Sequence, residues 1–207
     1  RDFALCVFLI FLPMCLIVMQ KETGSALVYL SFFLMLYREG MPGSILFTGV
    51  SAIVYFVVGV RFAETPFWQI PDVSLGQFMV LLLIQIFTTG MMWTYTDRPS
   101  VVYKTLGFGG AAVLVSALFA KYVIPFDVCW IQLIVCAFSV LYLVYLSMRE
   151  RLARYFYIAL FTLGSLALYY SSNYVMNQVL QPHQRTRIQV LLGLKDDPRN
   201  AGYNVIQ

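Results

Sequence analysis

Two polar segments interrupt an otherwise apolar chain, and they hold the residue types that could do chemistry. The first segment reads MQKETGSALVYL, in which Gln20, Lys21 and Glu22 break the apolar pattern. The second is the C-terminal run QPHQRTRIQVLLGLKDDPRNAGYNVIQ, which is rich in arginine, acidic residues and amides. Ionisable groups at membrane depth are costly and usually functional. Either segment alone is compatible with a solvated loop, but two segments facing one side of a membrane indicate a site.

The composition of the whole chain predicts a polytopic helical membrane protein. Hydrophobic residues make up 60% of the 207 residues and charged residues 12%, whereas a soluble domain has about 25% charged residues. Charge-poor windows near the roughly 20 residues needed to cross a bilayer recur along the chain. The net charge of +4 is explained by basic residues at membrane interfaces, so it does not imply a nucleic-acid partner.

We therefore expect an all-α fold with about seven transmembrane helices. The candidate spans are 3–19, 25–37, 44–60, 75–95, 105–122, 128–148 and 155–175. The second span is short for a full crossing, and Pro13 is expected to kink the first. The stretch GFGGAA at 107–112 offers a face of small residues for close helix packing.

The distribution of basic residues predicts the orientation of these spans. If the N-terminus is cytoplasmic, the inner loops carry Arg1, Arg38, Arg98, Lys104, Arg149, Arg151 and Arg154, and the outer loops carry Lys21, Arg61 and Lys121. The segment after Val175 adds outer basic residues, but the positive-inside rule discounts long loops. We expect Arg149–Arg154 in the cytoplasm and His183–Gln207 outside.

Several other features favour packing roles. The outer loop RFAETPFWQIPDVS, with Phe67 and Trp68, is interpreted as part of an interfacial aromatic belt, and a partner-docking loop is the alternative. Gln85 and Gln132 lie near span centres and are expected to bond a neighbouring helix. The cysteines lie in apolar windows without a CxxC pair, so no metal site is assigned.

The two polar segments resemble motifs of one known family. LIVMQKETGSALVYL is similar to the Q-P-D-x-G-[TS]-A-L segment of the RodA/FtsW/SpoVE (SEDS) family. HQRTRIQVLL…DDPRNAGYNVIQ resembles that family's Y-Q-x-x-R-I … D-P-x-x-x-G-Y-[QN]-x-x-Q loop. Both motifs occur in the family's order, and the resemblance is nearer the RodA branch than the FtsW branch. It implies a membrane peptidoglycan glycosyltransferase that polymerises lipid II into glycan strands during cell elongation and shape maintenance.

The resemblance also implies which residues bind the substrate. They are Gln20, Glu22, Gln184, Arg187, Asp197, Tyr203 and Gln207. The sequence departs from the family at Lys21, where a Pro is usual, and at His183, where a Tyr is usual. Glu22 replaces an Asp and keeps its carboxylate one methylene further out. Gly193-Leu194 stands where relatives often have an additional Asp-Pro.

Glycan polymerisation needs a base that removes the proton of a sugar hydroxyl and a cation that stabilises the departing pyrophosphate. Arg187 is the first choice for the diphosphate because its planar fork binds two oxygens, and Arg185 and Arg199 are further candidates. Glu22 is a candidate supporting base or salt-bridge partner, and a structural role is equally compatible. No residue of this chain is assigned as catalytic, because the family's proposed catalytic Asp corresponds to a position beyond Gln207. We expect the chain to be the middle part of a longer protein, and we expect this part to be inactive by itself. A divalent cation is left open as a cofactor.

The expected organisation has four parts. Residues 1–43 form core helices with the first motif, 44–148 an inserted four-helix block, 149–178 a core helix, and 179–207 the start of a large extracellular loop. Typical relatives have two spans between the motifs, so the four extra spans keep both motifs on the same side. The block has no paired buried charges, and we expect it at the side of the core, away from the substrate cavity.

The resemblance further implies a multi-pass protein of the bacterial inner membrane, with lipid II, membrane lipids and a class B penicillin-binding transpeptidase as partners. Two other functions stay open. One is a flippase or transporter of a lipid-linked peptidoglycan precursor, which would favour polar residues along a midplane path and inverted repeats, neither of which is clear here. The other is a non-catalytic membrane scaffold for a transpeptidase.

Overall fold

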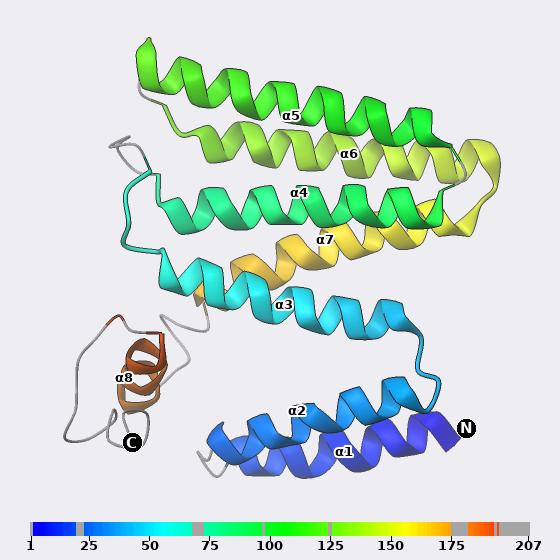
Figure 1. Cartoon of the computed structure of the whole chain (residues 1–207), viewed down its shortest axis with the longest axis vertical. Helices are drawn as coiled ribbons and strands as arrows, with labels where there is room; N and C mark the ends of the chain where they lie inside the picture. The colour runs from blue at the N-terminus through cyan, green and yellow to red at the C-terminus, as the bar shows by residue number, and fades with distance from the viewer. Residues whose placement is uncertain are drawn as a thin grey trace. The chain divides into compact units, whose positions relative to one another are not determined.

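The computed structural model confirms the predicted all-α fold (Figure 1). It describes residues 2–19, 23–67, 73–96, 98–123, 126–174, 182–192 and 194. The helices are α1 (Asp2–Met19), α2 (Thr23–Arg38), α3 (Gly43–Arg61), α4 (Leu75–Tyr95), α5 (Pro99–Tyr122), α6 (Val128–Glu150), α7 (Ala153–Tyr174) and α8 (Pro182–Leu191). Within these residues, the β-type pairing is one bridge between Pro66 and Ser74.

Four of the described helices are long and apolar enough to cross a membrane. These are α3 with 19 residues, α4 with 21, α5 with 24 and α6 with 23. A helix satisfies its own backbone hydrogen bonds, which is the condition for crossing hydrocarbon. The predicted total of about seven spans stays a prediction.

Three helix starts follow from local side-chain chemistry. Ser74 is the N-cap of α4, and its hydroxyl accepts a hydrogen bond from the backbone N–H of Gln77 at 3.1 Å. Asp127 caps α6 in the same way, accepting from the N–H of Cys129 at 2.8 Å. Helix α5 begins with Pro99, which suits the first helical position because its missing N–H would have no partner there.

The chain divides into two compact units, residues 1–51 and 52–207. In the first unit, α1 and α2 pack against each other. Helix α1 continues through Pro13 as one helix.

In the second unit, α4 and α6 are the central helices. Helix α4 contacts α5, α6 and α7, and α6 contacts α4, α5 and α7. Figure 1 shows α4, α5 and α6 as long neighbouring rods, with α7 running at an angle below α4. The buried core runs along the whole length of this bundle. One end is packed by residues such as Phe78, Ala117 and Val128, the middle by Tyr55, Ile84 and Cys136, and the other end by Met92, Val102 and Leu143.

The loop from α3 to α4 is tied to the bundle rather than spread over its surface. The N–H of Leu75 donates to the carbonyl of Thr65 at 2.7 Å, and the N–H of Phe67 donates to Val73 at 3.0 Å. The ring of Phe67 is 6% exposed and stacks on Phe78, with centroids 4.1 Å apart. Placing Phe67 in an interfacial belt was therefore wrong, because it is a core residue. Trp68 lies outside the described residues.

The small-residue face predicted at 107–112 is confirmed at one position. Gly109 is buried, and a Cβ there would meet the Gln85 amide and lie 3.2 Å from Val135 Cγ1. Gly107 and Gly110 have no neighbour within 4 Å of such an atom. The close approach of α5 to α4 and α6 thus depends on Gly109.

A closer backbone contact joins α3 and α4 at Gly76. A Cβ on Gly76 would lie 2.8 Å from the Gly59 carbonyl oxygen and 3.0 Å from the Phe62 carbonyl carbon. The Gly76 N–H also donates to the Phe62 carbonyl at 3.0 Å. Backbone atoms cannot move aside as a flexible side chain can, so only glycine fits here.

We predict that Gly76→Ala destabilises the bundle by about 1–3 kcal/mol, the usual cost of overpacking. The matched control is Gly90→Ala in the same helix, where a Cβ meets no atom within 4 Å. That change should be neutral or stabilising by up to about 1 kcal/mol, because alanine favours the helix. Unfolding of the purified protein in mild detergent, followed by helical circular dichroism, measures both. Equal effects of the two variants would contradict the close contact.

Candidate functional site

Two of the predicted substrate-binding residues lie in a described helix. Gln184 and Arg187 belong to α8. The positions 20, 22, 197, 203 and 207, predicted as Gln20, Glu22, Asp197, Tyr203 and Gln207, lie outside the described residues. The structure therefore places part of the second motif and leaves the first motif between the end of α1 at Met19 and the start of α2 at Thr23.

Helix α8 is an element that the sequence reasoning missed. It begins at Pro182, and its end is closed by hydrogen bonds from Leu192 N–H to the Ile188 carbonyl at 3.0 Å and from Leu194 N–H to the Gln189 carbonyl at 2.8 Å. The second bond spans five residues, as in the Schellman ending of a helix. The signal in the sequence was a Pro at the first helical position and a Gly at position 193, just past the end.

The helix gives the second motif a defined register. Gln184 and Arg187 are three residues apart in α8, so their positions share one face of the helix. Gln189 lies on the other side of the same helix by the same geometry. Val190, near the C-terminal end, is buried. A helical backbone therefore places the two positions of this motif on one face of α8.

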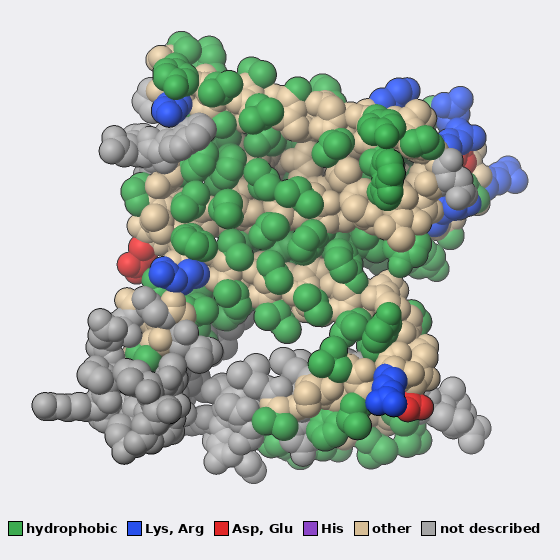
Figure 2. All heavy atoms as spheres, in the orientation of Figure 1, with side chains coloured by type: hydrophobic (Ala, Val, Ile, Leu, Met, Phe, Trp, Pro, Cys, Tyr) green, Lys and Arg blue, Asp and Glu red, His purple; other side chains and the backbone are tan. Residues whose placement is uncertain are grey.

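Basic residues gather at one end of the second unit. This end is formed where α4 ends, α5 begins, α6 ends and α7 begins. Its basic residues are Arg98, Lys104, Arg149, Arg151 and Arg154, and Figure 2 shows blue side chains clustered there, at the upper right. At the opposite end, Arg61 and Lys121 are accompanied by the acidic residues Glu64 and Asp127.

Two of these arginines hold helix ends together. Arg98 forms an ion pair with Glu150, with 2.6 Å between Nη1 and Oε1, and joins the start of α5 to the end of α6. Arg154 donates to the Tyr95 carbonyl at 3.1 Å and joins the start of α7 to the end of α4. This is the end that the positive-inside rule predicts to be cytoplasmic.

Helix α7 links this orientation to the candidate site. It starts at Ala153 beside the basic end and runs to Tyr174. The chain therefore leaves the bundle at the end opposite the arginine cluster before it reaches α8. The location of the second motif on the outer side stays a prediction.

Two contacts between buried polar groups join neighbouring helices of the bundle. The hydroxyls of Thr88 and Thr162 lie 2.9 Å apart and join α4 to α7. The Gln132 amide nitrogen lies 3.5 Å from the Phe78 carbonyl oxygen, as expected for a glutamine bonding a neighbouring helix. Among the described residues, no group of three or more His, Cys, Asp or Glu could hold a metal ion. These groups do not form a site of their own.

These features define the class: the chain is a polytopic helical membrane protein with a polar motif on a short helix beyond its bundle. In sequence it is 26% identical over 208 residues to the peptidoglycan glycosyltransferase RodA of Treponema pallidum (strain Nichols). The similarity covers the whole chain and 38% of RodA, so the chain spans well under half of that protein's length. No family model and no solved structure matches the chain.

The inserted four-helix block predicted at residues 44–148 stays a prediction.

We predict that a cysteine at position 151 is inaccessible to an impermeant thiol reagent in intact cells, whereas one at position 195 is labelled. Arg151 lies among the basic residues at the end predicted to be cytoplasmic, and α7 runs from that end to the opposite end of the bundle. The variants are Arg151→Cys and Lys195→Cys, and the unmodified chain, with its own cysteines, gives the background. Permeabilised cells should label both variants. Labelling of position 151 alone in intact cells would show that the orientation is the opposite of the predicted one.

Proposed function

We propose that the chain is part of a SEDS-type membrane glycosyltransferase that polymerises lipid II on the outer face of the bacterial inner membrane, in a role close to that of RodA. The observation that carries this proposal is the similarity to RodA along the whole chain. The two polar motifs, found independently of that similarity, support the same family.

The order of the helices supports a shared location for the two motifs. Six helices, α2 to α7, separate the segment before Thr23 from α8. Each membrane crossing moves the chain to the other side, so six crossings return it to the side where it started. An odd number would have separated the motifs. In the proposal, both motifs therefore lie on the outer side of the membrane.

The chemistry of α8 suits an anionic diphosphate. Arg187 can bind two phosphate oxygens through its planar fork, and Gln184 on the same helix face can donate from its amide. Glu22 follows an apolar span in the sequence, and an unpaired carboxylate close to that span would be costly. We assign it to orienting or deprotonating a polar partner, and assign the catalytic step to no residue of this chain.

The test uses the protein in the form that its own cell makes, purified in detergent and supplied with lipid II. Without a sealed membrane, transport cannot contribute to the signal, so polymerisation separates an enzyme from a flippase or a scaffold. Arg187→Ala should lower kcat/KM about ten- to a hundredfold, because a charged hydrogen bond is worth about 1.5–3 kcal/mol. Arg187→Lys should recover only part of this loss, since a point charge cannot bind two oxygens in one plane.

Glu22→Gln should also lower the polymerisation rate, and Gln189→Ala on the other face of α8 is the matched control that should not. All variants are compared at equal amounts of folded protein in the membrane. Wild-type rates for both Glu22→Gln and Arg187→Ala would show that these residues are structural. An absence of polymerisation by the unmodified protein, together with transport of the lipid in vesicles, would favour the flippase.

A further inference from the structure

Three basic side chains at the basic end of the second unit are available to a ligand. Lys104 of α5, Arg149 of α6 and Arg151, which follows α6, are exposed. None of the three forms an ion pair within the residues that the structure describes. Arg98 and Arg154 differ, because they already hold helix ends together. The fold therefore uses two cations of this end and leaves three facing their surroundings.

The positive charge of this end is not balanced locally. Its sequence holds five basic residues against two acidic ones, Asp97 and Glu150, and Glu150 is already paired with Arg98. Asp97 lies outside the described residues. At the opposite end of the bundle, the two described basic residues are matched by two acidic ones. A group of uncompensated cations at the membrane surface attracts anionic lipid headgroups.

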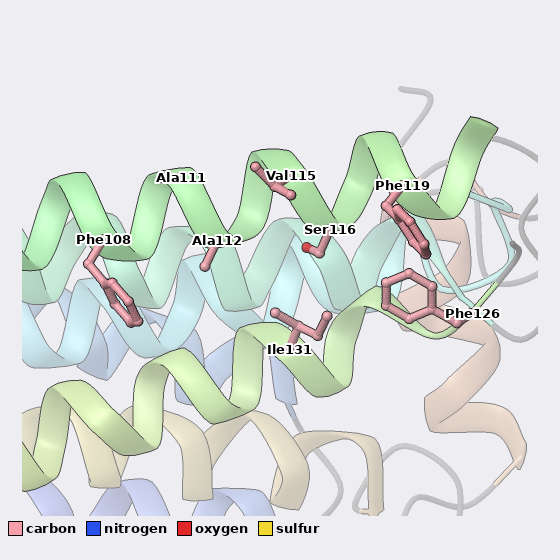
Figure 3. Close-up of a pocket in the computed structure, with 8 residues that line it drawn as sticks. All are labelled: Phe108, Ala111, Ala112, Val115, Ser116, Phe119, Phe126 and Ile131. Atoms are coloured by element: carbon pink, nitrogen blue, oxygen red, sulfur yellow. The ribbon is translucent and has the colours of Figure 1, made fainter. Parts of the chain in front are cut away.

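Helix geometry places two of these cations on the two sides of one interhelical seam. The seam between α5 and α6 has Phe108 on one wall and Ile131 on the other (Figure 3). Lys104 lies four residues before Phe108, so it shares that face of α5. Arg149 lies eighteen residues after Ile131, which is about five full turns, so it shares that face of α6. Lys104 and Arg149 therefore flank the seam where it reaches the basic end.

Aromatic side chains mark the depth of the membrane interface at this end. Trp93, near the end of α4, and Tyr103, near the start of α5, are 59% and 60% exposed. Their rings meet edge to face, with centroids 5.9 Å apart. Exposed tryptophan and tyrosine are enriched at the level of the lipid headgroups. Lys104 follows Tyr103 directly, so its long side chain can bring the ammonium to a lipid phosphate.

The backbone at Arg151 independently indicates that this side chain has a use outside the fold. Arg151 is the C-cap of α6 and takes the left-handed conformation, with φ of 55° and ψ of 34°. That conformation is unfavourable for a residue with a Cβ, and helices that end in this way usually have glycine there. Glycine would therefore suit the turn better than arginine. A phosphate bound by the planar guanidinium would offset the cost of keeping arginine.

We propose that the basic end binds the headgroup of an anionic phospholipid between α5 and α6, with its phosphate between Lys104 and Arg149 and with Arg151 beside it. The occupant is a lipid because the cations lie at headgroup depth, where anionic phospholipids concentrate negative charge. The site is separate from α8 and does not depend on the proposed enzymatic function.

The test is native mass spectrometry of the protein in the form that its own cell makes, in a neutral detergent, titrated with phosphatidylglycerol or with phosphatidylcholine of the same acyl chains. The unmodified protein should bind phosphatidylglycerol at least about fivefold more tightly, the factor expected for one basic residue beside an anionic lipid. The double variant Lys104→Gln, Arg149→Gln should bind the two lipids equally to within about twofold. The matched control Arg61→Gln, Lys121→Gln removes the same charge from the opposite end and should keep the full preference.

Arg151→Gly separates a headgroup ligand from a structural arginine. In neutral detergent without phosphatidylglycerol it should unfold at the same temperature as the unmodified protein or higher, because glycine suits the left-handed backbone. It should nevertheless bind phosphatidylglycerol about two- to fivefold more weakly. A lower unfolding temperature would overturn the assignment of Arg151 as a headgroup ligand.

Two kinds of result would overturn the proposal as a whole. One is an unmodified protein without a lipid preference, or a Lys104→Gln, Arg149→Gln variant that keeps the preference while helical circular dichroism shows it folded. The other is displacement of phosphatidylglycerol by an equal concentration of inorganic phosphate or by polyglutamate. The occupant would then be a soluble anion or an acidic protein segment, respectively.

Discussion

Helices surrounded by lipid gain little from burying apolar side chains against each other, because the lipid tails are equally apolar. The bundle must therefore be held by close backbone approach and by a few polar contacts. Gly76 supplies the closest approach, where the start of α4 meets backbone of α3 around Gly59. The hydroxyl pair Thr88–Thr162 supplies a contact between α4 and α7, of a kind worth about 0.6 kcal/mol on average. The stability of the bundle therefore depends on many small contributions, and each of them requires that neighbouring helices fit closely together.

The polar contacts at the basic end position the helices more than they stabilise them. The pair between Arg98 and Glu150 is partly exposed, and exposed pairs contribute only about 0–1 kcal/mol. Its effect is to align the start of α5 with the end of α6. The reversal from α6 to α7 is equally tight: Arg151 takes the left-handed conformation, with φ of 55°, and the Ser147 hydroxyl donates to the Leu152 carbonyl at 3.2 Å. These contacts set the direction of α7, and hence the side on which the chain leaves the bundle.

The sequence predicted the spans well where hydrophobicity alone decides them. The window 75–95 has the bounds of α4. The window 105–122 started too late, because Lys104 interrupts the apolar run although α5 begins at Pro99. Helix α8 was missed because it is short and polar, and its boundaries come from proline and glycine positions rather than from periodicity. The burial of Phe67 could not be read from the chain, because it depends on a loop bridge that brings its ring onto Phe78.

The contacts of α7 give the predicted inserted block a mechanical role. Residues 44–148 are predicted at the side of the core because this block carries no buried charge pair. Yet α7, the helix that leads toward the second motif, packs against α4 and α6 of that block and bonds to α4 through Thr162. A change in the packing of α4 would therefore shift α7 and the chain that follows it. Helices that carry no chemistry can in this way still set the geometry of a site beyond the bundle.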